Sequence, residues 1–184
     1  MSAKRIHKLF WDFEKEERWL NEMAAQGLNL VRYRWATYDF ELGAPGEWVY
    51  RIQFLDDDAR KPKSREYIDF VAETGAEPVA TYLRWVYFRK RTAEGPFELF
   101  SDLDSRLAHY KRVLAFYGAF TGIFLALSVP VFSRTIDAAE ETIGPYWGLP
   151  VFIVFIVLVV VFFVQTLRLA RHMRRLRARR MIEE

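Results

Sequence analysis

The chain has no cysteine and only three histidines among its 184 residues. The absence of cysteine excludes disulfides and thiolate chemistry, and it agrees with a cytoplasmic folded part. His7, His109 and His172 lie far apart in the sequence, and no two of them have the spacing of a metal site. Glycine-rich phosphate loops, nucleophile elbows and dinucleotide fingerprints are also missing. We therefore expect no catalytic residues, no metal site, no cofactor and no enzymatic activity.

Charge is missing from two long stretches in the second half of the chain. Residues 113–132 and 147–167 contain no Asp, Glu, Lys, Arg or His. About twenty apolar residues in a helix cover the roughly 30 Å hydrocarbon core of a bilayer. We predict a transmembrane helix in each stretch and a short extracytoplasmic loop over 133–146. Because neither stretch contains an ionisable residue, we do not expect an ion or proton pathway within the pair.

Basic residues predict the orientation of the two spans. Lys111 and Arg112 precede the first span, and seven arginines follow the second in a basic tail, residues 168–184, whereas the loop between the spans has only Arg134. By the positive-inside rule, both termini are expected in the cytoplasm.

The tail predicts contact with anionic lipid headgroups, to which each arginine near the surface contributes roughly 1 kcal/mol. The arginines expected to face the lipid are Arg168, Arg171, Arg174, Arg175 and Arg177. Residues 1–112 carry 19 basic and 19 acidic side chains, so the excess positive charge lies outside the soluble part. Nucleic acid is therefore not expected as a partner.

Residues 1–100 are predicted to form a cytoplasmic α+β domain, followed by a helical linker over 101–112 in which Asp104 or Ser105 caps the helix. A strand is expected near Lys4, and a helix capped by Asp12 and ended by Gly27 should follow. Residues 28–40 read as one long strand. The cleanest alternation of apolar and polar residues runs from Trp48 to Phe54.

The second half of the domain continues with a charged loop and a helix over 65–74, capped by Ser64 and ended by Gly75. Residues 79–91 favour strand, with a hairpin near Leu83. Phe97–Phe100 is a candidate extra strand.

The two halves resemble each other when Gly27 is aligned with Gly75. Apolar or aromatic residues then coincide along both helices and at the following strands, so that strand, helix and strand occur twice. Such a duplication is typical of the ferredoxin-like fold, in which two helices cover one face of an antiparallel sheet. The other face would stay open, either solvated or binding a ligand or partner, with the residues Arg32, Arg34, Arg51, Gln53 and Arg84.

Small residues four apart in the first span form a strip that allows another helix to approach closely: Gly118, Gly122 and Ala126. The strip could receive large side chains of the second span, a second copy of the chain, or another membrane protein.

Four segments carry a resemblance to a known family. They are Glu16-Glu17-x-Trp19-Leu20-Asn21-x-Met23-Ala24-x-x-Gly27, Tyr50-Arg51-Ile52, Glu66-Tyr67-Ile68-x-Phe70-x-x-x-Gly75 and Trp85-Val86-Tyr87-Phe88-Arg89-Lys90. With two late spans, they resemble a bacterial membrane-protein family known as domain of unknown function 2812. The resemblance implies a cytoplasmic domain anchored in a bacterial plasma membrane, often encoded beside PadR-type repressors, and it supplies no catalytic residues. In the family pattern, an aromatic residue commonly follows each helix-ending glycine. This chain departs from the pattern, because Leu28 and Ala76 stand at those two positions.

Together these observations favour a membrane-anchored sensing or protein-docking module without catalysis, whose partner is another protein or a second copy of itself. The alternatives are an accessory subunit of a membrane transporter and a membrane-surface enzyme acting on a lipid or small molecule.

Overall fold

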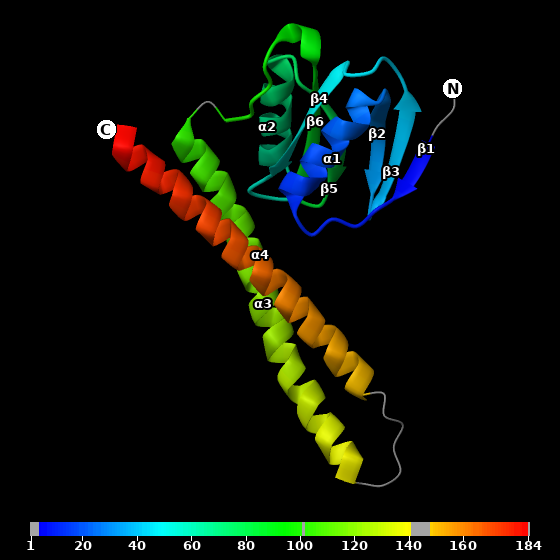
Figure 1. The fold of residues 1–184 in the computed structure, drawn as a ribbon, viewed down its shortest axis with the longest axis vertical. Coiled ribbons are helices and arrows are strands. Elements are labelled where there is room, and N and C mark those ends of the chain that lie inside the picture. Colours follow the sequence, from blue (N-terminus) through cyan, green and yellow to red (C-terminus); the bar gives the residue numbers. More distant parts are fainter. Residues whose placement is uncertain (1–3, 101, 141–147, 184) are drawn as a thin grey trace. The chain divides into compact units, whose positions relative to one another are not determined.

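The computed structural model describes residues 4–100, 102–140 and 148–183, and the chain divides into two units, Met1–His109 and Tyr110–Glu184. The first unit is an α+β domain. Its elements are β1 (Lys4–His7), α1 (Phe13–Ala25), β2 (Leu28–Arg34), β3 (Thr37–Leu42), β4 (Trp48–Phe54), α2 (Pro62–Glu73), β5 (Glu77–Tyr82), β6 (Trp85–Arg91) and a short 3-10 helix, Thr92–Glu94 (Figure 1).

The six strands form two antiparallel sheets of three strands each. Sheet A has the order β1-β3-β2, and sheet B has the order β4-β6-β5. The middle strand of each sheet, β3 or β6, is the last of its three strands in the sequence. The helices α1 and α2 are each followed directly by a hairpin.

The internal duplication is therefore present, as β-α-β-β twice. Gly27 and Gly75 are 48 residues apart, and adding 48 to each residue number in the β2–β3 pairing gives the β5–β6 pairing. For example, Leu30 lies opposite Phe40 in the first copy, and Pro78 lies opposite Phe88 in the second. Even the irregularity in pairing is repeated, because the register shifts between Leu30 and Arg32 in one copy and between Pro78 and Ala80 in the other.

The two helices pack in different places. α1 contributes Leu20 and Ala24 to a core cluster that contains residues of both sheets, whereas α2 contributes Ile68 and Val71 to a second cluster. Strand β6 separates the clusters, since Tyr87 belongs to the first while Val86 and Phe88 belong to the second. The two faces of sheet B thus face different helices, an arrangement that does not confirm the predicted ferredoxin-like order.

Several local predictions are confirmed. Asp12 caps α1, since its Oδ1 accepts hydrogen bonds from the backbone N–H of Glu14 and Lys15. Gly27 and Gly75 follow the two helices with positive φ, and β4 has the predicted bounds. The hairpin near Leu83 is also present.

Other local predictions are wrong. Residues 28–40 do not form one strand, because the chain reverses at Trp35 and Ala36. Helix α2 begins at Pro62 without a side-chain cap, since proline presets the φ of a first helical turn, and Ser64 instead donates to the carbonyl of Asp57. Phe97–Phe100 is not a strand, and Phe97 is buried in the cluster beside α2.

The second unit contains most of one long helix and all of another. The helix α3 (Leu103–Glu140) is capped by Asp102, whose carboxylate accepts from the N–H and the hydroxyl of Ser105, and not by Asp104 or Ser105 as predicted. Because α3 reaches Glu140, the first part of the predicted loop is helical, and the rest of that loop lies outside the described residues. The helix α4 (Gly148–Glu183) continues through the basic tail.

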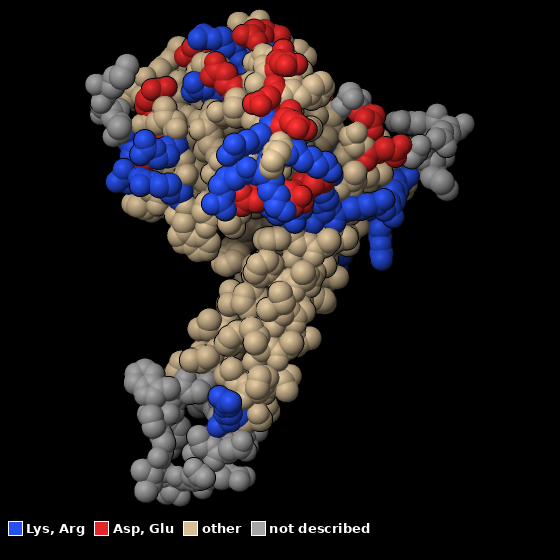
Figure 2. Space-filling view, turned by 180° about the vertical axis from the view of Figure 1, so that it is seen from behind, with Lys and Arg blue, Asp and Glu red and all other residues tan. Residues whose placement is uncertain are grey.

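Both helices are long and apolar enough to span a membrane. The spans meeting this criterion are Leu103–Arg134, with 32 residues, and Pro150–Ala178, with 29 residues. Figure 2 shows the described part of this helix pair as a surface almost free of Lys, Arg, Asp and Glu between its ends.

Candidate functional site

A buried carboxylate lies between the two sheets of the first unit. Glu16 is in the first turn of α1 and is only 8% exposed, and Trp19 and Leu20 on the same helix face are also buried. The hydroxyls of Tyr38 on β3 and Tyr87 on β6 both donate to its Oε1, at 2.7 and 2.6 Å. One carboxylate oxygen therefore joins α1 to a strand of each sheet.

A third tyrosine completes this Glu16 cluster, which we define as Glu16, Tyr33, Tyr38 and Tyr87. The ring of Tyr33 lies 4.8 Å from that of Tyr38 and 4.9 Å from that of Tyr87, between centroids. Burial raises the pKa of Glu16, and the two tyrosine hydrogen bonds oppose this rise. Burial, together with the charge of Glu16, raises the pKa of Tyr38 and of Tyr87. The tyrosines thus stay protonated and remain donors to the carboxylate.

The next carboxylate on α1, Glu17, binds backbone instead. Its Oε2 accepts from the N–H of Ile52 at 2.8 Å, and its Oε1 lies 3.4 Å from Nη1 of Arg51. Burial raises the pKa of Glu17. One turn later, Asn21 accepts from the N–H of Tyr50 and donates to its carbonyl. Two side chains of α1 therefore hydrogen-bond the backbone of β4, the outer strand of sheet B.

The sequence interpretation missed that Glu16 is buried and that Glu17 is half-buried. In the sequence alone, both belong to an acidic start of the helix, which suits the positive end of the helix dipole. A signal was available, since Glu16 lies three and four residues before Trp19 and Leu20 and so shares their face of the helix. A charged residue on an apolar helix face indicates a buried partner.

The five residues expected on one open sheet face do not share such a face in the structure. Gln53 is 3% exposed and exchanges hydrogen bonds with the hydroxyl of Tyr67 on α2. Arg84 donates to the carbonyl of Leu55 from two of its nitrogens and stacks over the ring of Phe54. Arg51 contacts Glu17, as described above.

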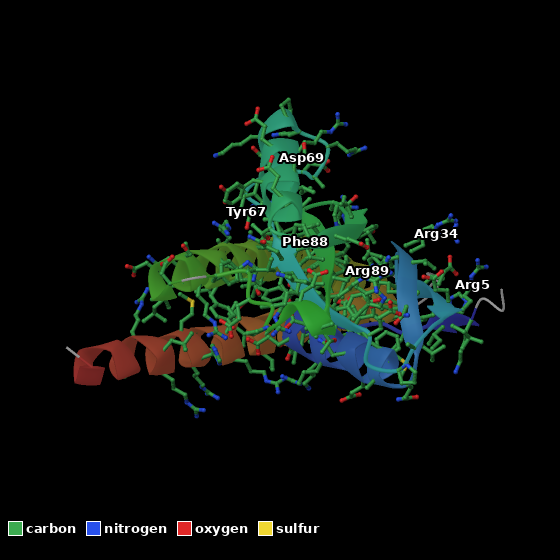
Figure 3. All side chains as sticks on the ribbon, turned by 90° about the horizontal axis from the view of Figure 1, so that it is seen from above. Arg5, Arg34, Tyr67, Asp69, Phe88 and Arg89 are labelled. Atoms are coloured by element: carbon green, nitrogen blue, oxygen red, sulfur yellow. The ribbon has the colours of Figure 1, made fainter. Side chains whose placement is uncertain are left out.

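The remaining two residues of that prediction, Arg32 and Arg34, are exposed on β2 of sheet A. Arg34 forms an ion pair with Asp39, which also pairs with Arg5 of β1 at 2.6 Å. Figure 3 shows Arg5 and Arg34 at the edge of the domain, pointing away from sheet A. The nearby guanidinium groups hold the pKa of Asp39 below its ordinary value.

The helix pair packs through aromatic rings and not through the small-residue strip. Phe120 stacks on Phe162 with 5.3 Å between ring centroids, and Phe124 lies 5.6 Å from the same ring. A Cβ added at Gly118 or Gly122 would meet no atom within 4 Å, and Ala126 is exposed. The strip is therefore open among the described residues, and side chains of the second span do not fill it there.

In the basic tail, Leu169 and Met173 are buried. The five arginines predicted to face lipid, Arg168, Arg171, Arg174, Arg175 and Arg177, are all exposed. This arrangement is compatible with the predicted headgroup contact, which stays a prediction. No three or more His, Cys, Asp or Glu residues are grouped to hold a metal ion within the described ranges.

Comparison with known proteins adds one match. The family model described as Protein of unknown function (DUF2812) matches residues 12–121, while no curated protein and no solved structure matches the chain. The matched segment contains all four resembling segments, the Glu16 cluster and the first part of α3, and it covers more than half of the 184 residues. The chain therefore belongs to the DUF2812 family.

Proposed function

We propose that this chain is a membrane-anchored module whose folded domain works in the cytoplasm through contact with a protein partner, as a sensing or docking device without catalysis. The observation that carries the proposal is the helix pair, in which two stretches long and apolar enough to span a bilayer pack on each other through phenylalanines. A domain with its own buried core accompanies this pair in the same chain.

The polar groups inside the domain support a docking role. Three charged side chains form hydrogen bonds to strands or loops of the same domain: Glu16, Glu17 and Arg84. They connect elements of the fold and do not point together into a substrate site. The family resemblance extends the proposal to a bacterial plasma membrane and to a regulatory response under a neighbouring repressor.

The orientation can be tested directly because the chain has no cysteine. A cysteine introduced by Thr142→Cys, in the predicted outer loop, should react with a membrane-impermeant maleimide on intact cells. A cysteine introduced by Ala178→Cys, within the arginine-rich tail, should react only after the membrane is opened, since the arginines favour the cytoplasmic side. Labelling of the tail from outside, or recovery of the protein without detergent, would contradict the anchored cytoplasmic module.

The open strip favours a second candidate function, an accessory subunit that docks on a transporter within the membrane. Small residues let two helices approach closely, and the strip is not occupied by the partner helix of this chain. We expect Gly122→Ile to abolish co-purification of a crosslinked membrane partner from gently solubilised membranes.

The matched control for this experiment is Leu127→Phe, which adds bulk on another side of the same helix at a position 46% exposed. It should leave the association intact. Equal recovery of the partner with Gly122→Ile would exclude the strip as an interface.

A further inference from the structure

The tips of the two equivalent hairpins expose large apolar side chains. The first tip is Trp35 and Ala36 between β2 and β3, and the second is Leu83 and Arg84 between β5 and β6. Trp35 is 66% exposed and Leu83 is 58% exposed. These two residues occupy the same place in the duplication, 48 residues apart, so an exposed apolar residue occurs at the first tip position in both copies.

Both tips violate ordinary turn chemistry. Two-residue hairpin turns favour Asn, Asp and Gly, which tolerate positive φ at little cost. Here Ala36 has φ 52° and Leu83 has φ 54°. In a bulky residue such as leucine, this backbone conformation lowers the stability of the fold. Strained conformations of this kind occur preferentially at functional sites.

The two tips lie side by side and have a third apolar neighbour. The ring of Tyr82, directly before Leu83, lies 6.4 Å from the ring of Trp35. The N–H of Lys8 donates to the carbonyl of Ala36 at 2.9 Å, which places the connection after β1 against the first tip. Leu9 in that connection is 49% exposed. We name Leu9, Trp35 and Leu83 the tip surface.

Basic side chains flank the first tip, and paired charges flank the second. Lys8, Arg32 and Arg34 are exposed near the first tip, and Arg34 shares Asp39 with Arg5. At the second tip the N–H of Ala59 donates to the carbonyl of Leu83, which places the loop of Asp56, Asp57 and Asp58 beside it, and these carboxylates pair with Lys63, Lys61 and Arg60. In Figure 2, Lys and Arg side chains gather where sheet A forms the edge of the domain. An exposed tryptophan flanked by cations, with exposed leucines near it, matches the boundary between acyl chains and anionic headgroups.

We propose that the tip surface inserts into the headgroup layer of the anionic bilayer in which the chain is anchored. This inference rests on the anchored module proposed above, because the covalent connection to two spans keeps the domain beside a bilayer. Three side chains are too few for a stable protein interface, which covers about 800 Å² on each partner. They suffice for a contact that the tether already favours by raising the local concentration.

The test uses the full chain reconstituted into vesicles of phosphatidylglycerol and phosphatidylcholine in equal parts. A polarity-sensitive fluorophore is attached to a single cysteine introduced by Leu83→Cys, or by Trp35→Cys in a second series. The emission should shift to the blue and be quenched by lipids that carry a nitroxide near the headgroup. Both effects should weaken in vesicles of phosphatidylcholine alone, since the arginines then lose their anionic partners.

Two controls separate this inference from the anchor itself. Phe70→Cys places the label on α2 at a position 62% exposed, where no lipid quenching is expected. Val154→Cys places it in the apolar part of α4, where quenching by deep nitroxides reports the span.

Each outcome decides the proposal. Quenching at 83 but not at 70 supports it. Quenching at 154 with equal, water-like emission at 83 and 70 overturns the tip contact and leaves the anchor intact. Absence of quenching at 154 contradicts the anchor and the tip contact together. A label at 83 that is shielded from aqueous iodide but not quenched by lipid would assign the tip surface to a protein contact and overturn the proposal.

Discussion

Glu16→Ala should lower the free energy of unfolding of the domain by about 2–4 kcal/mol. The hydroxyls of Tyr38 and Tyr87 would lose their shared acceptor inside the core, and each unsatisfied buried group costs about 1–3 kcal/mol. The cavity left by the side chain adds to this loss, while removal of a buried charge offsets part of it. The measurement is a urea titration of the full chain in mild detergent, followed by tryptophan fluorescence, because Trp19 lies 4.8 Å from the ring of Tyr38.

Glu16→Gln is the matched control, since it keeps the volume and one acceptor for the tyrosines. We expect it to remain within about 1 kcal/mol of the parent, in the range of a single neutral hydrogen bond. If the alanine and glutamine variants are equally unstable, the hydrogen bonds of the Glu16 cluster are not the cause.

The same pair of variants has a characteristic dependence on pH. The folded state raises the pKa of Glu16 above its ordinary value of 4.5, so the folded state binds more protons than the unfolded state just above that pH. The stability from this group is therefore complete below pH 4.5 and is lost as the pH rises through the raised pKa. Glu16→Gln should flatten this fall, and the part that remains belongs to Glu17, whose pKa is raised in the same direction. If Glu16→Gln leaves the slope of the unfolding free energy against pH unchanged, Glu16 is not the source of this pH dependence.

Gly27→Ala should destabilise the domain far more than Gly75→Ala, although the two glycines are equivalent in the duplication. Both have positive φ, 77° and 88°, where a Cβ costs roughly 1–2 kcal/mol. At Gly27 the added Cβ would also lie 2.6 Å from the carbonyl oxygen of Gly43, which is backbone and cannot turn away. Overpacking of this kind costs a further 1–3 kcal/mol or so.

At Gly75 the nearest atom to an added Cβ is Oε2 of Glu94, at 3.1 Å, and this flexible side chain can move. We therefore expect a loss of about 1–2 kcal/mol for Gly75→Ala and about 2–5 kcal/mol for Gly27→Ala, measured by the same titration. If both variants lose a similar amount of unfolding free energy, the backbone at Gly43 moves to accommodate the added Cβ.

The sequence predicted the two apolar helices and the duplicated halves because these patterns are local or repeat at a fixed distance. It missed the first hairpin because Trp35 and Ala36 carry none of the glycine or asparagine that marks a two-residue turn. That omission contributed to the ferredoxin-like expectation, since one long strand in place of the first hairpin gives the first half one strand too few.

The polar residues were harder to place than the elements. Gln53 alternates with apolar residues on β4 and was therefore assigned to an open face, yet α2 covers it through Tyr67. Whether a polar strand residue meets water or a helix depends on tertiary packing, which alternation alone does not encode. The strip of Gly118, Gly122 and Ala126 was recognised, but the use of phenylalanines for the contact between the helices depends on which helix faces pack together, and this is a property of the tertiary structure.

The hydrogen bonds from Glu17 and Asn21 to β4 have a consequence for assembly. A strand at the border of a sheet offers free backbone groups to any extended peptide, and this is a common route to edge-to-edge aggregation. Here the N–H groups of Tyr50 and Ile52 and the carbonyl of Tyr50 are already occupied by side chains of α1. Neither a partner's extended segment nor a misfolded neighbour can add a strand at that border without first displacing the helix.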